Sequence, residues 1–242
     1  MQRIRGIHSS RLHSNASPKK ALNRLHRNSV EKNAAMRALG VHLIEHGDDF
    51  TEASDHAAQL AEARGALRVP SFHADLVSGV ATYWWEFLKA VPQLDVAYVP
   101  IGLGSGACAA IAAKLALGHK ARIVGVVSRH ATTYADSLAA GRVVEAPVTT
   151  QIADGMAVRR ADAAALAAMT GRLDHVVQVS DDEVAGAMRA LYADTHNAAE
   201  GAGAAALAAA LQGRAALRGQ CVGIALTGAN VDASVFAEVL GR

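Results

Sequence analysis

The chain is poor in cysteine and in long apolar runs, and each shortage excludes a class of protein. Its 242 residues include two cysteines, Cys108 and Cys221, which lie far apart and have no paired spacing. This usage is typical of packed thiols in a reducing compartment, and it offers neither a disulfide framework nor a cysteine-rich metal site. No apolar run reaches the roughly 18 to 20 residues that a membrane-spanning helix needs. We therefore expect a cytoplasmic protein with no membrane partner.

Basic residues are scarce outside the N-terminus. Eight of the 24 Lys and Arg residues, but one of the 22 acidic residues, lie in the first 33 positions. The rest of the chain therefore has five more acidic than basic residues, although the formal net charge is +2. The absence of a basic face argues against binding to nucleic acid. Residues 1–28 have no hydrophobic period, so we expect a disordered tail there.

Predicted helices and strands alternate after this tail, with a boundary at Pro70 between a small unit (29–69) and a large unit (70–242). In the small unit we expect a helix over 29–39, a strand over 41–44, and a helix that begins at a capping box over 49–52. In the large unit we expect strands over 96–101, 122–128, 176–179 and 221–226. Helices are expected over 76–88, 107–117, 203–211, from 180 onward and at the C-terminus, with a loop-rich region before residue 176. Apolar strands that alternate with helices indicate an α/β fold with a parallel, doubly wound sheet.

The strongest local signal is a strand that runs into a glycine-rich turn and then a helix. Residues 96–101 precede Gly102, Leu103, Gly104, Ser105 and Gly106. Glycine allows a tight turn and a close approach to a ligand, and the amides and dipole of a helix N-terminus favour a phosphate. The sequence therefore predicts a phosphate-bearing ligand, and a tight turn without a ligand is the alternative.

Two other patterns need a different structural context. The turn also fits the dinucleotide fingerprint G-x-G-x-x-A, but the next strand ends at Ser128 and Arg129 without the carboxylate that holds the ribose of NAD. Arg129 tolerates a 2′-phosphate, so an NADP-binding domain is an alternative. Residues 42–46 match an H-x-x-E-H zinc pattern, which requires a helix. A strand there would separate the two histidines by roughly 13 Å, so we expect no zinc site.

Four segments together share their order and spacing with the motifs of one enzyme family. They are V-P-I-G-L-G-S-G at 99–106, I-A-D-G at 152–155, E-G-A-G-A-A at 200–205 and L-T-G-A-N-V-D at 226–232. Jointly they resemble the pyridoxal-phosphate-dependent threonine/serine dehydratases, the fold type II lyases. Gly201 stands where that family usually has proline, Thr227 where it has serine, and Ala229 where it has glycine. The resemblance extends from about Ser29 to the C-terminus.

The resemblance implies a large cofactor-binding domain preceded by the remnant of a small α/β domain. The amides of Gly102, Leu103, Gly104, Ser105 and Gly106 would bind the phosphate of pyridoxal 5′-phosphate, and the Thr227 hydroxyl would bind its pyridine nitrogen. A neutral hydroxyl there leaves the ring less protonated and favours elimination. Glu200 would lie near the ring, with a buried, hydrogen-bonded carboxylate as the alternative. Some relatives bind a divalent cation through carboxylates after the strand that here ends at Ser128. This chain has no carboxylates at those positions, so we expect no metal there.

The family's reactive lysine segment has no counterpart in this sequence. By the resemblance it would be an S-x-K-x-R-G-A-type segment near the N-terminus, and none of the six lysines has these neighbours. The lysine forms the Schiff base and moves the Cα proton. We therefore expect no catalytic residue here, and an N-terminally truncated or frameshifted family member that is inactive alone. The intact, homo-oligomeric enzyme would convert a hydroxy amino acid into a 2-oxo acid and ammonia. A non-catalytic, phosphate-ligand-binding or dimerising module is the competing hypothesis.

Overall fold

The structure is a computed structural model that describes residues 21–24 and 29–241. Its strands are β1 (Ala21–Arg24), β2 (His42–Glu45), β3 (Val96–Pro100), β4 (Arg122–Ser128), β5 (Val176–Val179) and β6 (Val222–Ile224). Its helices are α1 (Val30–Ala38), α2 (Phe50–Ala63), α3 (Ala74–Ala90), α4 (Ser105–Leu117), α5 (Thr133–Ala140), α6 (Ala163–Met169), α7 (Asp181–Thr195), α8 (Gly201–Gln212) and α9 (Ala233–Gly241). A short 3-10 helix covers Asp154–Met156.

Four parallel strands form the main sheet, in the order β5-β4-β3-β6. Val96 of β3 lies opposite Arg122 of β4 on one side and Val222 of β6 on the other. Every residue of β3 is buried, as are all but the first of β4. Apolar strands that are buried on both faces are typical of the centre of a parallel sheet. The predicted α/β fold with a parallel sheet is confirmed.

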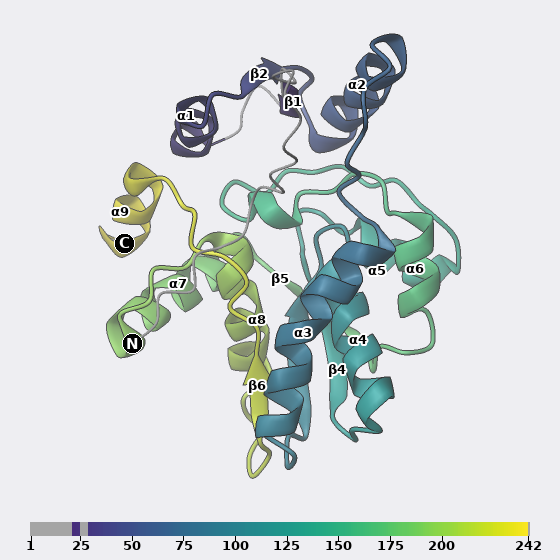
Figure 1. Cartoon of the computed structure of the whole chain (residues 1–242). Coiled ribbons are helices and arrows are strands. Elements are labelled where there is room, and N and C mark those ends of the chain that lie inside the picture. Colours follow the sequence, from purple (N-terminus) through teal and green to yellow (C-terminus); the bar gives the residue numbers. More distant parts are fainter. Residues whose placement is uncertain (1–20, 25–28, 242) are drawn as a thin grey trace.

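Helices cover both faces of this sheet (Figure 1). On one face α3, α4, α5 and α6 surround a core whose largest members include Trp84, Leu88, Ile101, Ile123, Tyr134 and Met169. On the other face α7, α8 and α9 pack around a second core that includes Val124, Val126, Met188, Leu191 and Val239. This arrangement is the doubly wound architecture that the alternating pattern predicts.

Side-chain caps explain where several helices begin. The side chain of Ser29 accepts a hydrogen bond from the backbone of Lys32, and that of Asp49 accepts one from Glu52. Ser180 and Glu183 form a complete capping box at the start of α7. Such caps satisfy amides that have no partner within the helix, and the predicted starts of α1, α2 and α7 agree with them.

The region between β4 and β5 is more regular than predicted. It contains α5, α6 and the short 3-10 helix, where the sequence indicates a loop-rich region. Helix α6 has seven residues, five of them alanine. A helix this short is not stable alone, so its formation depends on Ala165, Leu166 and Met169, which are buried against the rest of the protein. Within the described residues no helix has the length and apolar composition needed to cross a membrane.

The N-terminal elements form a second, smaller sheet in which β1 pairs in parallel with β2. Figure 1 shows this pair with α1 and α2 at one end of the main sheet. The expectation of disorder over residues 1–28 is wrong for residues 21–24, because pairing with β2 forms a strand that no local period reveals. The other residues of that tail lie outside the described ranges. The domain boundary at residues 69 and 70 stays a prediction.

Candidate functional site at the carboxyl edge of the main sheet

The glycine turn joins β3 to α4 in a conformation that depends on Gly104. This residue has a φ of 96°, in the left-handed region that residues with a side chain rarely adopt. A Cβ at Gly104 would also lie 2.9 Å from Cβ of Ala165 and 3.2 Å from Cε of Met169. Glycine is therefore required here both by the backbone and by the available space. The predicted strand, turn and helix are all present.

The N-terminus of α4 has no side-chain cap. The N-termini of α5 and α8 also lack one, whereas α1, α2, α3, α6 and α7 each have a side chain that accepts hydrogen bonds from first-turn amides. The first-turn amides of α4 belong to Ser105, Gly106 and Ala107, and such amides have no partner within the helix. Together with the positive end of the helix dipole they form a position suited to an anion.

Tyr134 of α5 fixes the glycine turn through hydrogen bonds of its hydroxyl. Its hydroxyl donates to the carbonyl oxygen of Leu103 at 2.8 Å and accepts from the backbone amide of Asp162 at 3.0 Å. The side chain is almost completely buried, and this burial raises the pKa of the phenol. The hydroxyl is therefore neutral at physiological pH and acts as a fixed link between the turn and the start of α6.

The I-A-D-G segment packs directly against the glycine turn. A Cβ added to Gly102 would overlap the carbonyl oxygen of Gly155. A Cβ added to Gly155 would lie 2.8 Å from Cβ of Ala202, and one added to Gly201 would overlap the carbonyl oxygen of Ile152. Three of the motif segments therefore approach one another so closely that no side chain fits at these three glycines.

The fourth segment, which follows β6, completes the cluster. The backbone amide of Glu200 donates to the carbonyl oxygen of Gly228 at 3.1 Å. A Cβ added to Gly203 would overlap that same oxygen, and a Cβ added to Gly228 would overlap the carboxylate of Glu200. The four segments that the sequence singles out thus meet at the carboxyl edge of the main sheet, where ligands bind in open α/β folds.

Glu200 and Thr227 differ in how they lie within this cluster. The Glu200 side chain is 17% exposed and precedes α8 as its N-cap residue. Thr227 is exposed and lies two residues after Ala225, whose amide still donates to the carbonyl oxygen of Tyr98 in β3 at 3.2 Å. Thr227 therefore stands where β6 leaves the sheet, at the same edge as the glycine turn.

Sequence reasoning missed Lys32 as a residue of this site. Its ammonium lies 3.0 Å from the Asp154 carboxylate and 3.3 Å from that of Glu200. Of the other lysines in the described ranges, Lys89 and Lys114 lie in the last turns of α3 and α4. Lys120 precedes β4, so these three lie toward the amino edge of the sheet. The one signal for Lys32 was its place in the first turn of a helix, where a cation is disfavoured.

No group of three or more His, Cys, Asp or Glu side chains within the described residues is placed to hold a metal ion. The H-x-x-E-H match falls on β2, so the predicted strand is confirmed there. His46 instead stacks on His56 of α2, with ring centroids 3.8 Å apart. The zinc reading of this pattern therefore lacks the helix that it requires.

The comparison with known proteins agrees with the four convergent segments. Residues 18–228 match the protein family described as "Pyridoxal-phosphate dependent enzyme". The chain belongs to this family. An L-threonine ammonia-lyase of Geobacter sulfurreducens is 37% identical over 215 residues, which are 88% of this chain and 53% of that protein. The biosynthetic L-threonine dehydratase of Salmonella typhimurium is 32% identical over 202 residues, covering 82% of this chain and 39% of that one. The chain thus spans about half or less of the length of these relatives.

Solved structures show the same fold. The processed form of threonine deaminase isoform 2 from Solanum lycopersicum has a TM-score of 0.80 at 25% identity, covering 91% of this chain and 66% of that one. Maize serine racemase has a TM-score of 0.79 at 26% identity, covering 90% of this chain and 68% of that one. Both agree with the predicted fold type II architecture.

The residues at the carboxyl edge fit the family's cofactor. The uncapped amides at the start of α4 suit a phosphate, and the turn before them has no side chain at Gly102 and Gly104. Thr227 offers a neutral hydroxyl and Glu200 a carboxylate at the same edge. These are the groups that the family resemblance assigns to the phosphate, the pyridine nitrogen and the vicinity of the ring.

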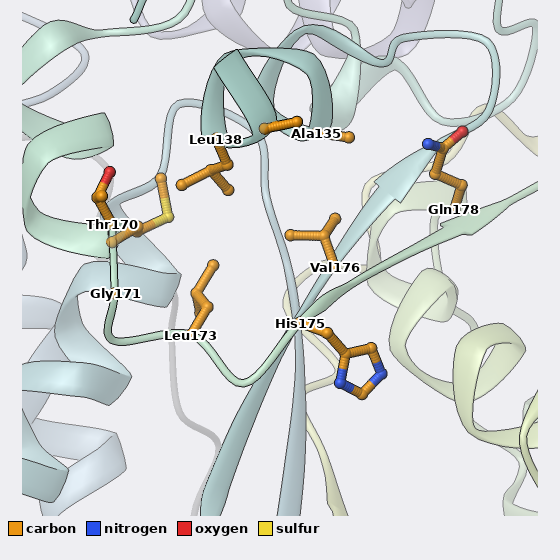
Figure 2. A pocket seen from close by; sticks show the side chains of 10 residues that line it. Ala135, Leu138, Thr170, Gly171, Leu173, His175, Val176 and Gln178 are labelled. Carbon is orange, nitrogen blue, oxygen red and sulfur yellow. The ribbon is translucent and has the colours of Figure 1, made fainter. Parts of the chain in front are cut away.

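A separate cavity of about 390 Å³ lies beside β5, an outer strand of the main sheet (Figure 2). Its lining comes from α5, the end of α6 and β5, and includes Leu138, Met169, Leu173 and Val176. None of the predicted cofactor-binding residues lines it. Among the described residues that line it there is no Lys, Arg, Asp or Glu side chain, so we do not assign the phosphate ligand to this cavity.

Proposed function

We propose that this chain binds pyridoxal 5′-phosphate at the carboxyl edge of its main sheet and is part of a threonine- or serine-type ammonia-lyase. In that reaction the hydroxy amino acid loses its β-hydroxyl and its amino group. Threonine would give 2-oxobutyrate and ammonia. The observation that supports the proposal is the convergence of the four motif segments at one edge, together with the threonine ammonia-lyases to which the chain is similar.

Each proposed site residue has a role that its chemistry allows. The amides of residues 102–106 bind the phosphate, and the dipole of α4 stabilises its charge. The Thr227 hydroxyl binds the pyridine nitrogen as a neutral partner, and Glu200 places a carboxylate near the ring. The cofactor, when bound, supplies the electron sink for breaking bonds at the amino acid's Cα. The protein residues orient it and shield it.

We further propose that the chain alone binds the cofactor but does not turn over substrate. Among the described lysines, Lys32 is the one at the carboxyl edge, and its ammonium is paired with two carboxylates. A paired ammonium is a poor nucleophile and a poor base. This observation also favours the second candidate function, a non-catalytic module that binds a phosphate ligand.

The two functions are separated by measuring binding and turnover on the same preparation. Titration with pyridoxal 5′-phosphate, followed by its fluorescence, is expected to show weak, saturable binding, because amides and a helix terminus contribute a few kcal/mol at most. Gly104→Asp should remove it, whereas Gly79→Asp, at an exposed position of α3 with no atom within 4 Å of the added Cβ, should not. Formation of 2-oxobutyrate from threonine would contradict the non-catalytic reading. Binding that survives Gly104→Asp would place the ligand elsewhere.

Other parts of the proposal rest on the family alone. Homo-oligomerisation, a small-molecule amino-acid substrate and a cytoplasmic location belong here as proposals. We also propose that no divalent metal binds after β4. At that position Ser128 is buried and the Arg129 guanidinium lies 4.0 Å from the Glu183 carboxylate. With the family shown, no observation favours the NADP-binding alternative.

A further inference from the structure

Lys32 joins two of the motif segments through its charge. Its side chain is 20% exposed and contacts Asp154, which is 53% exposed, and Glu200, which is 17% exposed. Burial alone would lower the pKa of Lys32, but the hydrogen bond and charge of Asp154, followed by Glu200, raise it above its ordinary value of 10.5. The ammonium is therefore charged at neutral pH and lies between two carboxylates that would otherwise repel each other.

The stability of α1 does not explain this placement. Lys32 is the third residue of α1, and a cation in the first turn of a helix is disfavoured by the helix dipole. The side chain has to extend away from its own helix to reach Asp154, which is 122 positions later in the sequence. Its partners in the motif segments offset that unfavourable position.

The same end of α1 is fixed to the segment after β6 by reciprocal capping. The Asp232 carboxylate accepts hydrogen bonds from the Ser29 hydroxyl and from the backbone amides of Val30, at 3.0 Å, and Glu31, at 3.3 Å. In return the Glu31 carboxylate accepts from the backbone amide of Ala233, the first residue of α9, at 2.7 Å. Each helix thus supplies a carboxylate to the N-terminus of the other, and α1 cannot shift without moving these groups.

We propose that Lys32 is a positioning residue of the cofactor site, which holds the carboxylates of Asp154 and Glu200 together and couples α1 to the segments that surround the cofactor. This inference rests on the proposed function. Lys32 acts through Glu200 and does not itself react with the cofactor. Loss of its charge frees the Glu200 carboxylate to move away from the ring position while the phosphate cradle at α4 stays intact.

The effect on cofactor affinity separates this role from general stabilisation. We expect Lys32→Gln to weaken binding of pyridoxal 5′-phosphate about fivefold, as a partly buried ion pair of about 1 kcal/mol predicts. Lys32→Arg should restore most of the affinity, and Lys89→Gln, an exposed charge at the far end of α3, should leave it unchanged. In a Glu200→Gln background the Lys32→Gln effect should largely disappear, because the two residues act as one unit. Equal weakening in both backgrounds would overturn the proposal.

A labelling experiment without cofactor tests the ion pairs directly. An amine-acetylating reagent should modify Lys32 more slowly than Lys89, as measured by peptide mass spectrometry. In the double variant Asp154→Asn/Glu200→Gln, the acetylation of Lys32 should become faster. Equal acetylation rates for Lys32 and Lys89 in the unsubstituted chain would refute the pairing of Lys32 with the two carboxylates. If the chain fails to bind pyridoxal 5′-phosphate but Lys32 is protected, the proposed function fails, and with it the positioning role, while the ion pairs of Lys32 with Asp154 and Glu200 stand. If the cofactor binds and the Lys32→Gln variant binds it equally well, the positioning role of Lys32 fails and the proposed function stands.

Discussion

Two glycine-to-alanine substitutions in helices should have opposite effects on stability, because one helix lies against the cofactor segments. In α8, a Cβ on Gly203 would overlap the carbonyl oxygen of Gly228 and lie 3.0 Å from its amide nitrogen. In α7, a Cβ on Gly186 would meet only Nη2 of Arg189, at an ordinary 3.8 Å. The two substitutions add the same methyl group to helical positions, so they differ mainly in the space available.

The magnitude follows from comparing two terms. Replacing glycine with alanine inside a helix contributes up to about 1 kcal/mol of stability. Overpacking costs about 1–3 kcal/mol, and Gly203 lies at the upper end of that range because the atoms in its way belong to the backbone. We expect Gly186→Ala to raise the free energy of unfolding by about 0.5–1 kcal/mol and Gly203→Ala to lower it by about 2 kcal/mol. The difference between them is about 3 kcal/mol.

Urea denaturation followed by circular dichroism measures both variants against the unsubstituted chain. Gly203→Ala should also weaken binding of pyridoxal 5′-phosphate, because relief of the overlap moves the segment that carries Thr227. Gly186→Ala should leave binding unchanged. A Gly203→Ala variant as stable as Gly186→Ala would show that α8 does not approach the segment after β6, and the described site would be wrong.

Three further outcomes test other parts of the structure. Tyr134→Phe removes the link between Leu103 and Asp162 and should cost about 1–3 kcal/mol in urea denaturation, whereas Tyr192→Phe, at an exposed position, should change stability by less than about 0.5 kcal/mol. A thiol reagent at pH 8 should label the partly exposed Cys221 and spare Cys108, since burial raises the pKa of Cys108 to about 11; rapid labelling of both would contradict this packing. The Ser29 hydrogen bond, then the amides of Val30 and Glu31 and the charge of Lys32, hold the pKa of Asp232 below 3.8. The stabilisation it provides is therefore present above about pH 4 and lost as pH falls through the lower, folded value. The stability gap between the unsubstituted chain and Asp232→Asn should narrow in acid.

The local features of the fold could be predicted because they depend on neighbouring residues. Strands β4 and β5 have the predicted bounds, since both segments are rich in Val and Ile, which favour strands. Helices α1 and α7 begin after Ser29 and Ser180 because a single side chain satisfies the first amides. The glycine turn was also predictable, because strand, glycines and helix follow one another directly.

Features that depend on distant contacts could not be predicted in this way. Strand β1 forms through pairing with β2, and α6 forms because Ala165 and Met169 are buried by other elements. The clustering of Gly102, Gly155 and Gly228 followed only from the family resemblance, since no local rule brings these segments together. The residues around Lys32 do not match the reactive lysine segment, and its partners Asp154 and Glu200 are far from it in sequence but close in space.

The central claim, that the start of α4 binds the cofactor phosphate, is tested most directly at Ser105. This residue begins α4 and already has a Cβ, so Ser105→Asp adds charge without new bulk at the backbone, and a carboxylate at a helix N-terminus does not destabilise the helix. Ser105→Asn is the uncharged control of nearly the same shape. Binding of pyridoxal 5′-phosphate should be saturable, be displaced by inorganic phosphate, and be weakened at least about tenfold by Ser105→Asp, because a carboxylate would face the phosphate at close range. Ser105→Asn should bind within about threefold of the unsubstituted chain. Equal affinities for Ser105→Asp and Ser105→Asn would show that the phosphate does not bind at this helix terminus.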